Sequence, residues 1–257
     1  MIATENYTIL MEHGLVIFKA KPESPVIISI PHDGLPFQTL SGFFEPRKIG
    51  YRGRDLNVWP VAKDILLSAR VNAVWGQMPR ALVDYNRAWP VGINYYPLTQ
   101  KEVHTALDDE RLLKAYQEYH AAIDRFLISA TEKFGRTKVL LVDLHGFNKQ
   151  PPYAPKGGFD LILGTGNRAS IHHGNIDEKL AKHLTDRGYQ VFLPQDKHLG
   201  PEEDYFSADF TTRHHSEKHG VSVIQVEINS RFRMRDARAL GQKLSLDLAE
   251  FFKNHCL

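Results

Sequence analysis

The most apolar stretch of the chain, KVLLVDLHGF at residues 138–147, predicts a strand that is buried on both faces. Residues 139–142 are all Val or Leu, which is typical of the middle strand of a parallel sheet. The stretch ends with Asp143, His145 and Gly146. Because ligands bind at the carboxyl ends of strands in open parallel sheets, we expect a functional site at this strand end.

Apolar runs and amphipathic stretches continue to alternate along the rest of the chain. They predict strands at residues 7–10, 15–18, 25–30, 73–78, 159–164, 189–193 and 221–228. Apolar spacing of three to four predicts helices at residues 55–71, 102–134, 175–187, 210–218 and 236–254, with Asp55 as the N-cap of the first. The alternation indicates an α/β fold with a mixed, largely parallel sheet and helices on both faces. We find no linker or repeat, so residues 1–257 are interpreted as a single domain.

Composition excludes several classes of function. Lys and Arg number 32 and Asp and Glu number 30, so net charge gives no general attraction to nucleic acid or to a membrane. The one cysteine, Cys256, excludes a disulfide within the chain and a cysteine-based zinc site. No signal pattern or membrane-length apolar run is present, so a cytoplasmic setting is expected. Thirteen histidines make a histidine metal site worth seeking.

Three residues could ligate a metal at the strand ends. His32 follows the strand at 25–30 in a Pro-His-Asp-Gly turn, and His145 ends the strand at 138–147. Either could bind zinc as a neutral imidazole, or could be a solvated or carbonyl-bonded histidine. Asp55 could add a carboxylate ligand or serve only as an N-cap. Two histidines and one carboxylate suit a hydrolytic zinc site with a fourth position for water, although no spacing rule connects these three.

Further polar residues could act on a substrate. Glu227 ends the strand at 221–228 and is the candidate general base, the alternative being an exposed glutamate on an edge strand. Asn86 and Arg87 could orient an acidic substrate, since arginine grips carboxylates through two hydrogen bonds, or Arg87 could belong to an ordinary surface ion pair. Arg80 and Arg213 add positive charge whose position the sequence does not fix.

Other motifs are discounted. Residues 164–169 match a dinucleotide-binding fingerprint, but the pattern requires a helix to open at once and residues 170–174 are loop-like. The adjacent pairs at 172–173 and 214–215 are poor chelates in a strand, because neighbouring side chains point to opposite faces. The sequence contains no nucleophile elbow and no phosphate-binding loop.

Taken in order, five segments resemble the N-formylglutamate amidohydrolase family, whose relatives include zinc carboxypeptidases and aspartoacylases. They are PHDG at 31–34, RD at 54–55, R-x-x-x-DYNR at 80–87, DLHGF at 143–147 and QVEI at 225–228. The resemblance implies a phosphorylase/hydrolase-like α/β fold. It also implies a zinc amidohydrolase that removes an N-acyl group, such as formyl, from a small-molecule substrate, an acylated acidic amino acid.

The resemblance also implies a role for each residue of the set. The zinc ligands would be His32, Asp55 and His145, and the general base would be Glu227. Asn86 and Arg87 would hold the substrate carboxylate or polarise the scissile carbonyl, and Arg80 and Arg213 would be further carboxylate contacts.

The sequence departs from the family pattern at several positions. Carboxypeptidase relatives carry His-x-x-Glu, whereas Leu35 stands at that offset here, so Asp33 rivals Asp55 as the second ligand. Residues 208–209 are Ala-Asp where the family tends to have Gly-Gly, and Gly146 replaces a serine. Two alternatives therefore stay open: a zinc peptidase or amidase acting on a peptide, and a catalytically silent binding protein for an acidic small molecule.

Overall fold

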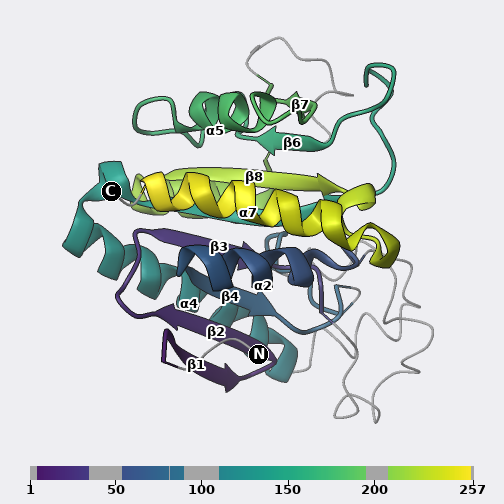
Figure 1. Ribbon diagram of the computed structural model, residues 1–257. Coiled ribbons are helices and arrows are strands. Elements are labelled where there is room, and N and C mark those ends of the chain that lie inside the picture. The colour runs from purple at the N-terminus through teal and green to yellow at the C-terminus, as the bar shows by residue number, and fades with distance from the viewer. Residues whose placement is uncertain (1–4, 35–53, 81, 90–109, 195–207, 256–257) are drawn as a thin grey trace.

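The structure is a computed structural model that describes residues 5–34, 54–80, 82–89, 110–194 and 208–255 (Figure 1). Its centre is an eight-stranded sheet with the order β1-β2-β4-β3-β5-β8-β6-β7. The strands are β1 (Tyr7–Glu12), β2 (Leu15–Ala20), β3 (Val26–Ile30), β4 (Asn72–Gly76), β5 (Leu140–Phe147), β6 (Leu161–Gly164), β7 (Val191–Phe192) and β8 (Ser222–Asn229). The sheet extends across the described part of the molecule, from β1 at one edge to β7 at the other.

The four central strands are parallel, and this arrangement positions the site. β4 pairs with β3, β3 with β5, and β5 with β8, all in parallel. The outer pairings of β2 with β1, β2 with β4 and β6 with β8 are antiparallel. In the register of β5 and β8, His145 lies opposite Glu227. The carboxyl ends of β3, β5 and β8 therefore meet at one edge of the sheet, as expected for an open α/β fold.

Helices cover both faces of the sheet (Figure 1). The helices are α2 (Val58–Ala69), α4 (Glu110–Phe134), α5 (Ile176–Thr185), α6 (Phe210–His219) and α7 (Arg238–His255), with short 3-10 turns at Arg136–Lys138, Ser230–Phe232 and Arg235–Ala237. Buried side chains of α2, α5 and α7 share one hydrophobic core with the sheet, and those of α4 share a second core with its other face. α6 lies beside α4 and β8.

The burial of β5 on both faces accounts for its continuous run of apolar residues. Leu140, Val142 and Leu144 pack into the core under α2 and α7, whereas Leu141 and Val139 pack into the core under α4. Side chains alternate between the two faces along a strand, and here both faces are covered. The predicted mixed, largely parallel sheet with helices on both faces is confirmed.

The predicted elements agree with the structure apart from their ends and one cap. The helix expected at 55–71 begins at Val58, with Asn57 in the N-cap position, so the N-cap role predicted for Asp55 is wrong. The helix expected at 102–134 is observed from Glu110, and residues 102–109 lie outside the described part. Residues 92–99 and 200–207 also lie outside the described part.

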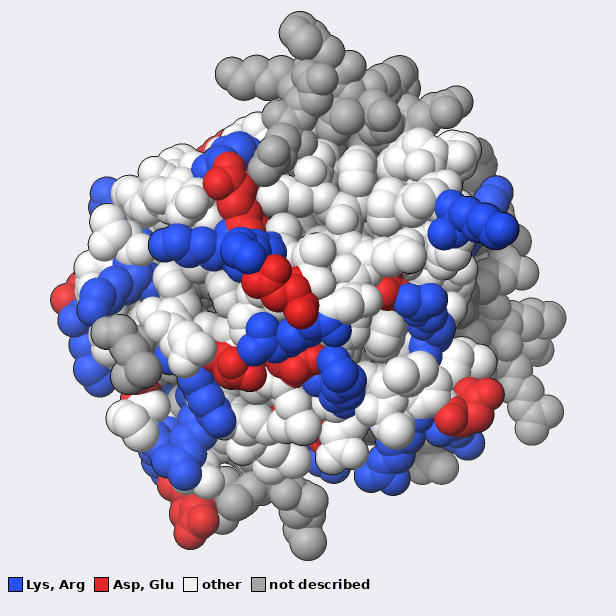
Figure 2. All heavy atoms as spheres, turned by 45° about the horizontal axis from the view of Figure 1, so that its top comes forward, with Lys and Arg blue, Asp and Glu red and all other residues white. Residues whose placement is uncertain are grey.

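Charged side chains of both signs are interleaved on the face shown in Figure 2. Arg187, just after α5, pairs with Asp247 and Glu250 of α7, and Lys243 pairs with Asp247. The two pairs made by Arg187 link the end of α5 to α7 at the surface. Among the described helices none is both long and apolar enough to cross a bilayer.

Candidate active site

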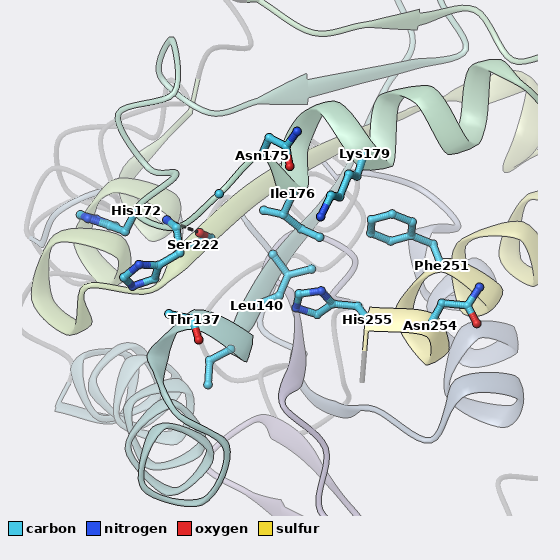
Figure 3. Close-up of a pocket in the computed structure, with 13 residues that line it drawn as sticks. Thr137, Leu140, His172, Asn175, Ile176, Lys179, Ser222, Phe251, Asn254 and His255 are labelled. Carbon is cyan, nitrogen blue, oxygen red and sulfur yellow. Dashed lines mark hydrogen bonds between the residues drawn. The ribbon is translucent and has the colours of Figure 1, made fainter. Parts of the chain in front are cut away.

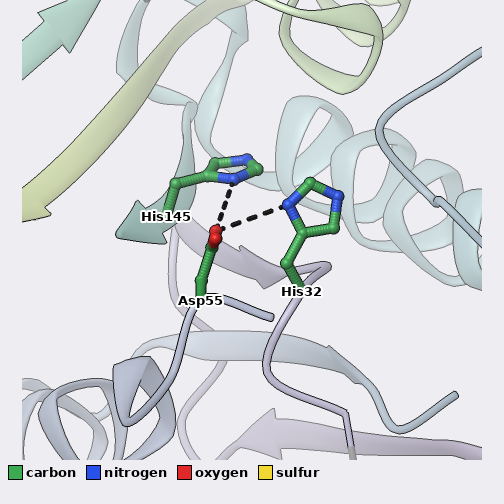
Figure 4. Close-up of side chains that lie close together, drawn as sticks. All are labelled: His32, Asp55 and His145. Atoms are coloured by element: carbon green, nitrogen blue, oxygen red, sulfur yellow. Dashed lines mark hydrogen bonds and ion pairs between the residues drawn. The ribbon is translucent and has the colours of Figure 1, made fainter. Parts of the chain in front are cut away.

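Two histidines and one aspartate meet at the carboxyl edge of the parallel strands (Figure 4). His32 follows β3, His145 lies in β5, and Asp55 lies in the segment before α2. Oδ2 of Asp55 is 3.4 Å from Nδ1 of His32 and 3.1 Å from Nδ1 of His145. All three residues are buried. Their three ligand atoms lie within 4.8 Å of one another, which is the spacing of a group that can hold a metal ion.

A second carboxylate holds the outer nitrogen of each histidine. Nε2 of His32 lies 2.7 Å from Oδ1 of Asp84, and Nε2 of His145 lies 2.9 Å from Oδ2 of Asp143. Asp143 is itself fixed by the hydroxyl of Ser29, which donates to it at 2.6 Å. Carboxylates in this position fix the tautomer and the ring orientation of metal-ligating histidines. Both Nδ1 atoms are thereby turned toward Asp55.

The charges of the group lower the pKa values of two of its carboxylates and raise the pKa of His145. Burial opposes the ionisation of Asp55, but the hydrogen bond from His145 and the nearby imidazole of His32 outweigh burial and hold its pKa below the usual range. Burial likewise opposes ionisation of Asp84, but His32 and Arg80 lower its pKa. Burial would lower the pKa of His145, but the nearby carboxylates raise it well above its ordinary value. The group is rich in negative charge and suits a cation.

Glu227 lies beside this group on β8. Burial raises its pKa to about 7, and the charge of His145 opposes that rise. Its Oε1 accepts a hydrogen bond of 2.9 Å from the amide of Gln225. A carboxyl whose pKa lies near neutrality can both accept and return a proton at physiological pH.

Asp33, the rival of Asp55, faces a different part of the structure. Its Oδ2 accepts a hydrogen bond of 2.6 Å from the backbone N–H of Trp59 in the first turn of α2. Its Oδ1 lies 2.7 Å from Nη2 of Arg54. Asp33 therefore caps α2 from a distance, while Asp55 occupies the position between the two histidines.

Three further residues lie at the border of the His32–Asp55–His145 group: Asn86, Arg87 and Asp209. Nδ2 of Asn86 lies 3.3 Å from Nε2 of His145, and its Oδ1 accepts from the backbone N–H of Thr211 at 2.8 Å. Nη1 of Arg87 pairs with Oδ2 of Asp209 at 2.8 Å. The residue at 209, where the resembling family tends to have glycine, thus places a carboxylate directly on the predicted substrate arginine. Ala208 beside it has φ 143°, in the region that favours glycine.

The other two arginines of the predicted set differ in position. Arg80 donates from Nε to Oδ2 of Asp84 at 3.0 Å, and its Nη1 lies 3.9 Å from Oδ1 of Asp55. Arg213 is exposed on α6, and it has no hydrogen bond or ion pair with the described residues of the histidine group. The structure therefore brings Arg80 to the group and leaves Arg213 outside it.

Sequence reasoning missed Arg233, a buried residue behind the site. Its guanidinium donates to the carbonyl oxygens of Ile228 and Phe147 at 3.0 Å each, and also to that of Leu56. It therefore ties the ends of β8 and β5 to the segment that bears Asp55. A Cβ at Gly146 would stand 2.4 Å from Cζ of Arg233, so the glycine found here in place of serine is needed for this packing. An arginine directly after a 3-10 turn has no sequence signal that separates it from a surface residue.

Two further features lie away from the group. After Gly164 the chain turns, with Asn167 and Arg168 at positive φ, and the next helix begins only at Ile176, so the loop predicted at residues 170–174 is confirmed. Figure 3 shows a pocket of about 600 Å³ lined by Leu140 and Ser222. These two residues begin β5 and β8, so the pocket opens at the amino ends of the strands, opposite the candidate site.

Two solved structures share the fold of this chain over most of its length. The N-formylglutamate amidohydrolase of Ralstonia eutropha JMP134 matches with a TM-score of 0.68 and 18% identity, covering 94% of this chain and 99% of that one. A gene product of Agrobacterium tumefaciens matches with a TM-score of 0.64 and 16% identity, covering 94% of each chain. A metallo-carboxypeptidase from Pseudomonas aeruginosa overlaps with a TM-score of 0.43 and 12% identity, covering 97% of this chain and 63% of that one.

The family follows from the sequence itself. The model of the N-formylglutamate amidohydrolase family matches residues 24–234, and the chain belongs to that family. The resemblance seen in the ordered motifs is thereby confirmed, and the chain is a hydrolase that acts on an amide. Comparison with curated protein sequences gives no match.

Proposed function

We propose that the protein is a zinc-dependent amidohydrolase that removes a formyl-type N-acyl group from an acidic amino acid. The observation that supports it best is the arrangement of His32, His145 and Asp55. Two imidazole Nδ1 atoms face one carboxylate oxygen at 3.4 and 3.1 Å, while each Nε2 is held by a carboxylate of its own. The substrate class comes from the family and from the arginines beside the group.

The residues fit a zinc ion. Ligand atoms of tetrahedral zinc with bonds of about 2.1 Å stand about 3.4 Å apart, close to both Asp55–histidine distances. Nδ1 of His32 is buried and has no well-formed hydrogen bond with the described residues, so a polar atom is left for a ligand. His32, Asp55 and His145 would hold the ion, with Asp84 and Asp143 as the carboxylates that orient the histidines. When bound, zinc polarises a carbonyl and lowers the pKa of water.

Glu227 moves the proton in this proposal. It lies across from His145 in the register of β5 and β8, so its carboxylate faces the same edge of the sheet. In its ionised form one carboxylate oxygen accepts a proton from the attacking water. The same group then gives that proton to the nitrogen of the leaving amine, whose bond to the acyl carbon breaks. A pKa of about 7 suits both halves of this cycle.

Arg87, Asn86 and Arg80 would orient the substrate. Arg87 lies next to Asn86 in sequence and donates to its backbone carbonyl at 2.8 Å, which directs the guanidinium along the edge of the group. A guanidinium binds a carboxylate through two parallel hydrogen bonds, so Arg87 suits the carboxylate of an amino acid. Asn86 and Arg80 lie closer to the histidine group and would contact the scissile carbonyl. Arg213 stays a predicted outer contact.

A substrate panel tests the proposal. Zinc-loaded protein is assayed with N-formyl-L-glutamate, N-formyl-L-aspartate, N-acetyl-L-glutamate, N-formyl-L-leucine and a formylated dipeptide, and the free amine is quantified. We expect the formylated acidic amino acids to react fastest. Faster cleavage of the dipeptide would instead support the peptidase alternative. Binding of formylglutamate with no turnover of any compound would support the silent binding protein.

Two variants make the panel specific. Glu227→Gln keeps the shape of the general base and removes its ability to accept a proton, so it should lose turnover on every substrate. Glu250→Gln is the matched control, because that carboxylate is exposed on α7 and pairs with Arg187 away from the site. Equal activity in the two variants would contradict the role of Glu227.

A further inference from the structure

A second group of two histidines and one aspartate lies on the helices, apart from the candidate active site. His215 and His219 stand at positions i and i+4 of α6, and Asp124 comes from α4. Residues i and i+4 of a helix stand on the same face, so both imidazoles point to α4. His214, the sequence neighbour of His215, stacks on Phe210. The relevant partner of His215 is one helical turn further on.

The three side chains converge on one oxygen atom. Oδ1 of Asp124 lies 3.1 Å from Nδ1 of His215 and 2.7 Å from Nε2 of His219. The ligand atoms of all three residues lie within 4.8 Å of one another. His215 is fully buried, while Asp124 and His219 are partly buried, so the group has access to solvent. Widening these two distances by about 0.3 and about 0.7 Å would bring them to the ligand spacing of about 3.4 Å around zinc.

A neighbouring histidine orients His215. Its Nε2 lies 3.0 Å from Nδ1 of His120 on α4, and the two rings stack with centroids 5.2 Å apart. This contact occupies the nitrogen that faces away from Asp124 and leaves Nδ1 directed at the carboxylate. A metal-ligating histidine characteristically donates its other N–H to a fixed acceptor in this way.

We propose that Asp124, His215 and His219 form a second binding site, structural in role, for a divalent transition metal of the zinc class, and that the bound ion ties α4 to α6. Lys218 now pairs with Oδ2 of Asp124 at 2.7 Å. That ion pair leaves Oδ1 for the metal, and the ammonium of Lys218 is half exposed and can move to solvent. Imidazoles and a carboxylate are the donors that zinc, nickel and cobalt prefer.

The site would connect to the active site only through the position of α6. The first turn of α6 holds Asn86, because the backbone N–H of Thr211 donates to its Oδ1. Asp209, immediately before the helix, pairs with Arg87. A metal that fastens α6 to α4 would therefore stabilise the folded chain and keep Asn86 in place, without contributing a group to the chemistry.

Metal stoichiometry tests the inference independently of any enzyme activity. Metal-stripped chain is titrated with Co²⁺, and binding is followed by visible absorption and elemental analysis. We expect about two ions per wild-type chain, about one in His145→Ala, and about one in His219→Gln. The double variant His145→Ala/His219→Gln should bind none. His214→Gln is the matched control on the same helix and should keep both ions.

Thermal stability supplies a second readout should His145→Ala fail to fold. A ligand that binds only the folded state at a hundred times its Kd stabilises by about 2.7 kcal/mol, which raises Tm by several degrees. The zinc-dependent rise in Tm should be smaller in His219→Gln and in Asp124→Asn than in wild type and His214→Gln. A stoichiometry and Tm response that are the same in His219→Gln as in wild type would overturn the inference, whatever the ion count of His145→Ala.

Discussion

The described part of the chain holds two groups of the same composition, two histidines and an aspartate, on different kinds of scaffold. His32, Asp55 and His145 come from strand ends and a loop, so they meet only because the sheet brings distant segments together. Asp124, His215 and His219 project from two neighbouring helices. The first group is surrounded by further buried carboxylates, whereas the second faces Lys218 and a partly open surface.

This difference supports the proposal that the strand-end group does the chemistry. In the strand-end group each histidine has a carboxylate behind it, and Glu227 lies close enough for its charge to interact with His145. In the helical group Nε2 of His215 faces His120, whose pKa burial holds well below its ordinary value, and the carboxylate is already shared with a lysine. Donor composition alone therefore does not define a catalytic centre. The surrounding acid–base groups and the burial do.

The most direct test of the different roles of the two groups is to replace one histidine in each. His145→Ala should lower kcat/KM by about 1000-fold or more, because losing several kcal/mol of transition-state stabilisation costs about tenfold per 1.4 kcal/mol. His219→Gln should lower kcat/KM by less than about tenfold, because it contacts no reacting group. Steady-state assays with N-formyl-L-glutamate on both variants give the ratio. Equal losses would mean that the two groups have been assigned the wrong roles.

The pH dependence of activity should follow Glu227. The protonated carboxyl cannot accept a proton, so activity should rise as pH rises through the pKa of this group. Burial raises that pKa to about 7, and a bound dication would lower it. Below this pKa kcat/KM should fall about tenfold per pH unit. The acid limb should be present in wild type and in His219→Gln. A profile that stays flat from neutral pH down to the onset of unfolding would contradict the role.

Asp209 should control substrate affinity rather than turnover. Its carboxylate occupies Arg87 at 2.8 Å and would repel an incoming substrate carboxylate. Asp209→Asn removes that charge, so KM for formylglutamate should fall by a few-fold, about 3 to 10, with kcat changed less. KM for formylleucine, which has one carboxylate fewer, should change less and serves as the control. A rise in KM for formylglutamate would show that Asp209 helps to bind the substrate.

The smallest expected effect lies at the surface, where α7 meets the end of α5. Burial opposes ionisation of Asp247, but hydrogen bonds from Lys243 and Tyr189 lower its pKa in the folded chain. Its contribution to stability is therefore complete above about pH 4 and is lost as pH falls through the lowered pKa. Asp247→Asn should cost about 1 kcal/mol at pH 7 and less in acid, measured by urea unfolding. Glu250→Gln, at a more exposed pair, should cost less at every pH.

The fold was predictable because it is determined by local apolar patterns. The run at 138–147 is buried on two faces in the structure as it is in the prediction, and the amphipathic helices end within a few residues of the expected positions. The strand-end location of His145 and Glu227 followed from the same patterns. The family resemblance added the order in which the polar residues belong together.

The remaining features depend on contacts between residues far apart in the chain. Asp84 reaches His32 across 52 residues, and Asp209 reaches Asn86 across 123. No periodicity relates such positions, so neither contact could be inferred from spacing. Of the two roles expected for Asp55, the N-cap role is wrong, because Asp33 binds the first turn of α2, and the carboxylate of Asp55 faces the histidines. The contacts of Asp124 could not be predicted for the same reason, because its partners lie 91 and 95 residues away in the chain.

One measurement tests the central claim most directly, and it combines zinc content with turnover in Glu227→Gln. The account predicts a variant with wild-type zinc content and a kcat lowered by about 100-fold to 10,000-fold on N-formyl-L-glutamate, because a proton acceptor is lost while the metal ligands stay. A variant that retains full activity, or that loses its zinc together with its activity, would contradict the assignment of Glu227 as the general base beside a His32–Asp55–His145 metal centre.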